Sequence, residues 1–175
     1  MTTSIKILKA FHGDCILIRV INEMQQEFTI LIDGGTSKTF DFSLKKELRS
    51  IKKINLFVLT HIDSDHIGGI LRFVKDSIFQ EIDIDEFWIN GANLAYISMG
   101  GNISYNQGQN LEKLLIEKGI FKEKIISNIT TNYKPVFPDF INIDILSPTP
   151  EILQNLYDKW PKQNLKNIIS MDIVI

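Results

Sequence analysis

Cysteine is almost absent from this sequence: Cys15 stands alone, so no internal disulfide can form, and a single thiol fits a reducing compartment. No apolar run approaches the roughly 18 residues that a membrane-spanning helix needs. The start, MTTSIKILKAF, has no basic segment followed by a long apolar one, so it predicts a first strand and not a signal peptide. We therefore expect a cytoplasmic protein with no membrane partner.

Neither sign of charge dominates, because 19 Lys and Arg face 21 Asp and Glu, for a net charge of −2. Proteins that grip phosphate backbones usually carry a basic excess. The near-equal numbers of positive and negative residues thus do not indicate nucleic-acid binding, although they are compatible with a nuclease that has a locally basic groove. The hydrophobic fraction of 44% is that of a folded protein, and 175 residues are the size of one domain, residues 1–175.

Short apolar runs bounded by turn residues alternate with helical patterns along the chain. Asn90–Asn110 is rich in Gly and Asn and long for a loop, so it predicts a lid or binding loop. The order of strands followed by strand–helix units indicates an α/β sandwich with a mixed sheet. We expect strands around Ile5 and Ile7 and at Cys15–Ile21, Phe28–Ile32, Ile54–Leu59, Glu86–Ile89, Ile125–Ile129, Phe140–Leu146 and Ile168–Ile175, and helices around Leu44–Ile51, after Gly69, at Leu111–Lys118 and at Glu151–Trp160.

The chemistry is concentrated in one segment, Thr60-His61-Ile62-Asp63-Ser64-Asp65-His66-Ile67-Gly68-Gly69, which holds two of the chain's three histidines. It follows an apolar strand and precedes a helical pattern. A tight turn at a strand end can curl alternate side chains around one centre, and the helix that follows offers free backbone N–H groups. A structural domain with a coincidental loop remains the alternative, but the clustering favours metal binding by His61, Asp63, Asp65 and His66.

The segment resembles the signature of the metallo-β-lactamase superfamily, Thr-His-x-His-x-Asp-His-x-Gly-Gly. Supporting matches are His12-Gly13-Asp14-Cys15-Ile16-Leu17-Ile18, Leu31-Ile32-Asp33-Gly34-Gly35 and Ile143-Asp144-Ile145-Leu146-Ser147-Pro148. The resemblance implies an αββα sandwich. It covers the N-terminal half of that fold, so we expect a sandwich truncated to that half.

The resemblance also implies roles for the site residues. His61 and Asp63 would bind a first metal ion and Asp65 and His66 a second, up to two ions in all, with Asp65 as the catalytic group that orients the attacking water. Asp33 and Asp14 would support the ligands or form turns instead of binding metal directly. Zinc is the expected ion and manganese the alternative.

The sequence departs from the family pattern in two ways. Position 63 is Asp where most members have His, as in the related domain of bacterial DNA-uptake channel proteins and in relatives linked to phage defence; a carboxylate favours harder ions and phosphodiester chemistry. In addition, no histidine follows His66 and no Gly-Asp pair supplies a bridging carboxylate. We therefore expect a phosphodiester hydrolase that is feeble alone, or else a non-catalytic metal-binding or interaction module. Both readings predict self-association or a complementing protein partner, and the first predicts a nucleic-acid or phosphoester substrate.

Overall fold

The computed structural model describes residues 1–90, 111–159 and 172–174. Its main sheet has six strands in the order β1-β2-β3-β4-β5-β6. β1, β2 and β3 are antiparallel neighbours, whereas β3, β4, β5 and β6 run parallel, which confirms the mixed sheet. The strands are β1 (Thr2–Ile7), β2 (Ile16–Ile21), β3 (Glu27–Ile32), β4 (Lys53–Leu59), β5 (Asp83–Ile89) and β6 (Ile125–Ile126).

A second sheet pairs β7 (Asp144–Ser147) with β8 (Asp172–Val174) in antiparallel fashion. The helices lie between and after these strands. They are α1 (Ser37–Thr39), the π-helix η1 (Phe40–Leu44), α2 (Lys45–Leu48), α3 (Ser64–Lys75), the 3-10 helices η2 (Ser77–Glu81) and η4 (Lys122–Lys124), a helix at 111–117, and α5 (Pro150–Lys159). Within the ranges that the structure describes, no helix is both long and apolar enough to cross a membrane.

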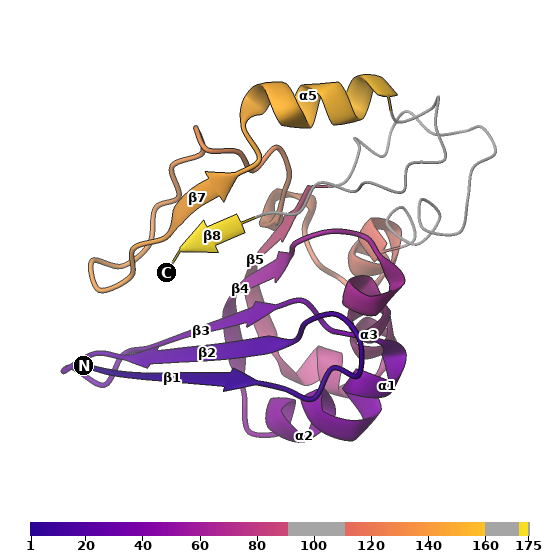
Figure 1. Cartoon of the computed structure of the whole chain (residues 1–175). Helices are drawn as coiled ribbons and strands as arrows, with labels where there is room; N and C mark the ends of the chain where they lie inside the picture. Colours follow the sequence, from indigo (N-terminus) through magenta and orange to yellow (C-terminus); the bar gives the residue numbers. More distant parts are fainter. Residues whose placement is uncertain (91–110, 160–171, 175) are drawn as a thin grey trace.

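The elements form layers on the two faces of the main sheet. Figure 1 shows α1, α2 and α3 on one face, and β7, β8 and α5 on the other. On the helical face, sheet residues such as Leu17 and Leu31 pack with Phe40 and Phe73 in a helix-side core. On the opposite face, an inter-sheet core joins residues such as Trp88 to the β7 segment. The arrangement is that of the predicted αββα sandwich.

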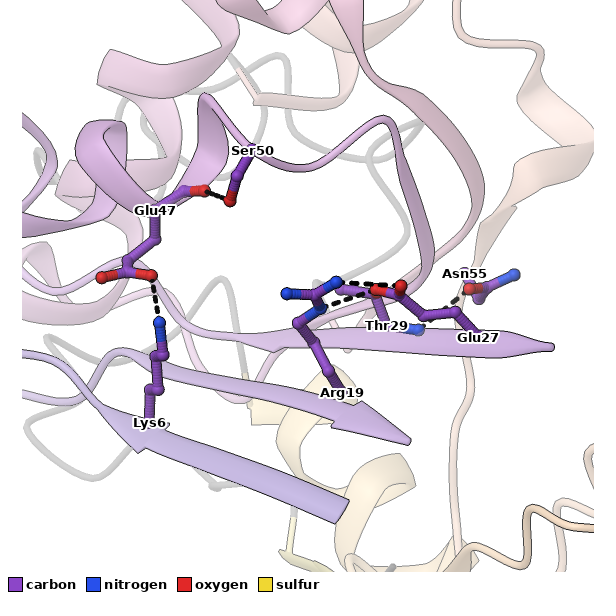
Figure 2. Close-up of polar contacts among 7 residues, drawn as sticks. All are labelled: Lys6, Arg19, Glu27, Thr29, Glu47, Ser50 and Asn55. Atoms are coloured by element: carbon purple, nitrogen blue, oxygen red, sulfur yellow. Dashed lines mark hydrogen bonds and ion pairs between the residues drawn. The ribbon is translucent and has the colours of Figure 1, made fainter. Parts of the chain in front are cut away.

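Polar contacts link β1 to α2 and join neighbouring strands of the main sheet. Figure 2 shows the Lys6 ammonium of β1 bonded to Glu47 of α2 at 2.6 Å, and Arg19 held by both oxygens of Glu27 at 2.6 and 2.9 Å. Nearby, the Thr29 amide donates to the Asn55 side chain at 2.9 Å, which links β3 to the start of β4. Each of these polar side chains thus has a hydrogen-bond partner.

Two predicted strands are shorter than expected. The run Ile125–Ile129 forms only β6, because Asn128 has a positive φ of 63° that turns the chain, and Ile129 then pairs with the buried Asn90 side chain instead of a strand. In the part of the chain that the structure describes, the run Phe140–Leu146 forms a ladder from Asp144 onward, where β8 pairs with Asp144, Ile145 and Ser147. The apolar alternation was nevertheless informative, because Ile141, Ile143 and Ile145 are all buried in the inter-sheet core.

Most other expected elements are found close to their predicted places. The helical face built on Leu44, Leu48 and Ile51 is buried. The helix at 111–117 ends before Gly119, whose φ is 91°, and α5 matches the predicted Glu151–Trp160 helix. The lid predicted for Asn90–Asn110 lies outside the described residues beyond Asn90, and so does most of the strand predicted for Ile168–Ile175.

Candidate metal centre

The site forms where two parallel strands end side by side. β3 and β4 are parallel neighbours in a register that places Ile32 opposite Val58, and the Asp33 amide extends the pairing by donating to the Val58 carbonyl at 2.9 Å. The residues that follow each strand therefore emerge at the same edge of the sheet. Asp33 follows β3, and Thr60 and His61 follow β4. Carboxyl ends of parallel strands are the usual place for ligands in open α/β sheets.

Asp33 is the buried anchor of this edge, with a side chain that is 1% exposed. Its φ of 54° lies in the left-handed region, which Asp tolerates better than most residues. One carboxylate oxygen accepts the Thr60 amide at 2.8 Å, and the other accepts the Thr60 hydroxyl at 2.6 Å and His66 Nδ1 at 2.8 Å. Three donors thus compensate one buried negative charge.

This anchor also sets the protonation of both imidazoles. Because the Asp33 carboxylate can only accept, His66 Nδ1 must carry the proton that it donates. The single Thr60 hydroxyl proton goes to Asp33, so at the 2.9 Å contact between Thr60 Oγ1 and His61 Nδ1 the histidine must be the donor. In their neutral form both rings therefore have an unprotonated Nε2, the form in which imidazole binds metal.

The two rings lie together, with centroids 3.7 Å apart. His61, His66 and Asp33 each offer a ligand-type atom within 4.8 Å of one another, the one group of three such residues among the residues described. The oxygens of Asp33 are already engaged by three donors. Asp33 therefore acts as the acceptor that orients the histidines, and the Nε2 atom of each ring takes no part in these hydrogen bonds.

Asp63 stands at the N-cap of α3 but does not cap the helix. Asp at this position ordinarily accepts a backbone N–H of the first turn through its side chain, and here no such bond forms. Instead, one carboxylate oxygen lies 3.8 Å from His61 Nε2, with the side chain 46% exposed. The carboxylate is free to bind an ion together with His61.

Asp65 and the β1–β2 loop complete the surroundings. Asp65 lies half-buried in the first turn of α3. The loop passes so close that a Cβ added to Gly13 would fall 1.9 Å from the Asp65 carbonyl oxygen and 3.1 Å from His66 Nε2. His12 and Asp14 flank Gly13 and are exposed, and neither joins the His61–His66–Asp33 group.

The charges around the rings shift their pKa values in opposite directions. Burial, and then the neighbouring His66, lower the pKa of His61 despite the carboxylates of Asp33, Asp63 and Asp65. Burial also opposes protonation of His66, but the hydrogen bond and charge of Asp33, with Asp65 and Asp14, raise its pKa above the ordinary value. A proton and a cation thus compete for Nε2 of His66, the more so as the pH falls.

Cys15 carries the one thiol of the chain, but its side chain is not available as a metal ligand. Its side chain is fully buried in the helix-side core. Burial, with the charges of Asp33 and Asp14, raises the pKa of the thiol to about 12. Metal binding needs the thiolate, so Cys15 acts as a small core residue.

The residues present fit a divalent cation. His61, His66 and Asp63 supply two neutral imidazole nitrogens and one uncommitted carboxylate, the donor types that zinc and manganese accept. Sequence reasoning gave no role to Thr60, whose hydroxyl connects His61 to Asp33. The sequence feature that could have indicated this role is the position of Thr60, directly after the strand and directly before His61.

The comparison with known families agrees with this geometry. The family model described as Metallo-beta-lactamase superfamily matches residues 8–109, a stretch that includes the β1–β2 loop, Asp33 and the whole His61–His66 segment. A search of the curated proteins finds no match. The matched stretch exceeds half of the 175 residues. On the strength of that match and of the site that it contains, the chain belongs to the metallo-β-lactamase superfamily.

Proposed function

We propose that this protein is a metal-dependent hydrolase of phosphodiesters. The observation that carries the proposal is the pair of Nε2 lone pairs that Asp33 fixes, directly beside an Asp63 carboxylate that leaves the helix uncapped. A cap residue usually contributes about 1 kcal/mol to stability through its side chain. A side chain that forgoes this bond and lies 3.8 Å from His61 Nε2 is best explained by a ligand role.

His61, Asp63 and His66 would hold the ion, with Asp65 beside them. A divalent cation bound there would lower the pKa of a water molecule and polarise a phosphoryl oxygen. Asp33 keeps both imidazoles in the metal-binding tautomer throughout. Asp65, in the first turn of α3, would accept the proton of the attacking water. The free N–H groups of that turn favour an anionic substrate.

The ligand set supports the choice of substrate and metal. Asp63 replaces an imidazole by a harder oxygen donor, which keeps zinc as the expected ion and adds manganese as the alternative. Lactam chemistry is not implied by this change. The resemblance of the loop to that of relatives linked to phage defence supports a nucleic-acid substrate and a defence role in the cytoplasm.

A second ion would need more ligands than the described residues bring together. Structural and catalytic zinc sites usually take at least three ligands from protein, and the described residues near the site offer three or four for both ions together. We therefore propose that a complementing polypeptide supplies further ligands, and that the chain alone hydrolyses esters slowly.

Hydrolysis of bis(4-nitrophenyl) phosphate tests the proposed function. We expect slow release of nitrophenolate that depends on added zinc or manganese, and loss of that release to the background in Asp65→Asn, which keeps the side-chain volume but cannot accept a proton. Asp83→Asn, an exposed carboxylate at the start of β5, is the control and should not change the rate. No metal-dependent release by a protein that has bound metal would reject the proposal.

A second candidate function, a non-catalytic interaction module, is favoured by β1. Ile5 and Ile7 of β1 pair with Ile18 and Ile16 of β2, and those two β2 residues pack in or against the inter-sheet core. The side chains of Ile5 and Ile7 themselves are 62% and 79% exposed. The apolar face of the main sheet thus extends beyond the part that the described β7 segment covers and reaches the edge strand β1, where a further polypeptide could pack.

Self-association tests this candidate. We expect light scattering to show a mass above 20.1 kDa at micromolar concentrations, and we expect Ile5→Ser with Ile7→Ser to return the monomer. Met24→Ser is the matched control, because Met24 is 76% exposed in the turn between β2 and β3. A wild-type chain that stays monomeric across a wide concentration range would count against it.

A further inference from the structure

An exposed aromatic residue sits under strain in the loop that borders the metal centre. Phe11 has a φ of 65°, a left-handed conformation that bulky residues rarely adopt. It is the central residue of a tight turn closed by the His12 amide, which donates to the Ala10 carbonyl at 2.8 Å. The ring is nonetheless 42% exposed. The core therefore gains little from the strain, and strain of this kind concentrates at functional sites.

A second exposed ring meets it from the helical layer. Phe42 lies in the π-helix η1, where Phe40 and Leu44 point into the core and Phe42 is 73% exposed. The centroids of the Phe11 and Phe42 rings lie 5.4 Å apart at an interplanar angle of 75°. Single π-helical turns are rare and frequent at functional sites. The two rings form one open aromatic surface, which we call the Phe11–Phe42 platform.

The platform is held in place and carries a positive charge. The Thr39 hydroxyl donates to the Ala10 carbonyl at 2.6 Å, and the Ser43 hydroxyl lies 3.1 Å from the Lys9 carbonyl, so the two residues that precede Phe11 are bound to the helical layer. The Lys9 ammonium lies 5.1 Å from the centroid of the Phe11 ring. A cation over an exposed ring is the combination that attracts a base and its phosphate together.

The platform also lies next to the metal centre. Gly13, two residues after Phe11, would place a Cβ 3.1 Å from His66 Nε2. Since consecutive Cα atoms are about 3.8 Å apart, Phe11 and Gly13 are separated by no more than about 8 Å. A nucleotide chain whose phosphate sits at the histidines can therefore reach the rings within one or two units.

We propose that the Phe11–Phe42 platform binds a nucleobase of single-stranded nucleic acid and sets the position of the strand relative to the metal centre. The inference rests on the proposed phosphodiester hydrolysis and deepens it by naming the substrate class. Stacking on exposed rings tolerates any base, because every base has an aromatic face. The platform thus selects base-bearing single strands over other phosphodiesters, without reading their sequence.

Fluorescence anisotropy with the full chain in EDTA tests the platform without cleavage. The two probes are a labelled octathymidylate and an abasic tetrahydrofuran strand of the same length. We expect tighter binding of the thymidylate, and a loss of about fivefold or more for it alone in Phe42→Ala and in Phe11→Asn. Asn accepts the left-handed backbone of position 11, so that variant removes the ring and keeps the turn.

Phe121→Ala is the matched control, because Phe121 is 72% exposed but precedes η4, which leads into β6 at the opposite edge of the sheet from β1. It should bind both strands as the wild type does. Equal affinity for the two strands, or an equal loss in Phe121→Ala, would overturn the platform. The proposed function fails separately: base preference in EDTA that persists without any metal-dependent cleavage would reject hydrolysis and leave the platform standing.

Discussion

Asp33→Asn will weaken metal binding by about 10- to 100-fold while leaving the fold in place. An amide has one oxygen, and the Thr60 backbone N–H at 2.8 Å cannot reverse its role as donor, so that oxygen must stay with Thr60. The amide nitrogen then faces His66 Nδ1, which must become an acceptor. The His66 proton moves to Nε2 and blocks the atom that binds the ion. Asn also accepts the φ of 54° at this position.

Isothermal titration with zinc measures the affinity, and nitrogen-15 chemical shifts of the imidazoles report the tautomer. Asp33→Ala should in addition lower the free energy of unfolding by about 3 kcal/mol or more, because it leaves the Thr60 and His66 donors buried and unpaired. Asp83→Asn, with a side chain 63% exposed, is the control for both measurements. Wild-type affinity in Asp33→Asn would contradict the proposed role of the anchor.

Gly69→Ala will destabilise the protein by about 3 kcal/mol or more, although Ala favours a helix over Gly by about 1 kcal/mol. A Cβ at Gly69 would lie 1.9 Å from the Gly34 carbonyl oxygen and 2.7 Å from its carbon. Both are backbone atoms of the turn after Asp33, and the Gly69 amide donates to Gly35 at 2.9 Å in the same contact. α3 would have to move away from the turn, and the histidine loop would move with it.

Gly68→Ala is the matched control, because it adds the same methyl group to the same helix. Its Cβ would lie 3.1 Å from the Ser37 amide and 3.4 Å from Thr36, a tight contact that a shift of a few tenths of an ångström relieves. Urea denaturation followed by circular dichroism should place Gly68→Ala far closer to the wild type than Gly69→Ala. Equal midpoints for the two variants would show that α3 can separate from the turn without cost.

The sequence indicated which segment holds the candidate site, but not the hydrogen bonds that join this segment to Asp33. The spacing of His61, Asp63, Asp65 and His66 after an apolar run predicted a metal site in this segment, because a strand-to-helix loop is a local feature that sequence encodes directly. Of these four residues, His61 and His66 lie together with Asp33 in the group of possible ligands. The hydrogen bonds from Thr60 and His66 to Asp33 could not be read in the same way. They depend on β3 and β4 being parallel neighbours, which is a property of the whole sheet.

The same difference between local sequence features and contacts between distant segments decides which features of the fold were predicted. Apolar alternation identified the buried side chains of Ile141 and Ile143, but it did not determine where a strand ladder begins, since a ladder also needs a partner. The Phe11–Phe42 platform was not predicted either. Its two phenylalanines are far apart in the sequence, and nothing in their immediate neighbours shows that both rings stay exposed.

The short span of the ligands has a consequence for chelation. His61, Asp63 and His66 lie within six positions, so an ion that joins them closes only a small loop, whereas the long crossover from β3 to β4 is closed by strand pairing and by the Asp33 hydrogen bonds. Removing the ion takes nothing from the two hydrophobic cores. In small zinc domains the metal is a condition of folding. Here we expect the metal-free protein to keep its architecture, so that removing and returning an ion would not unfold it.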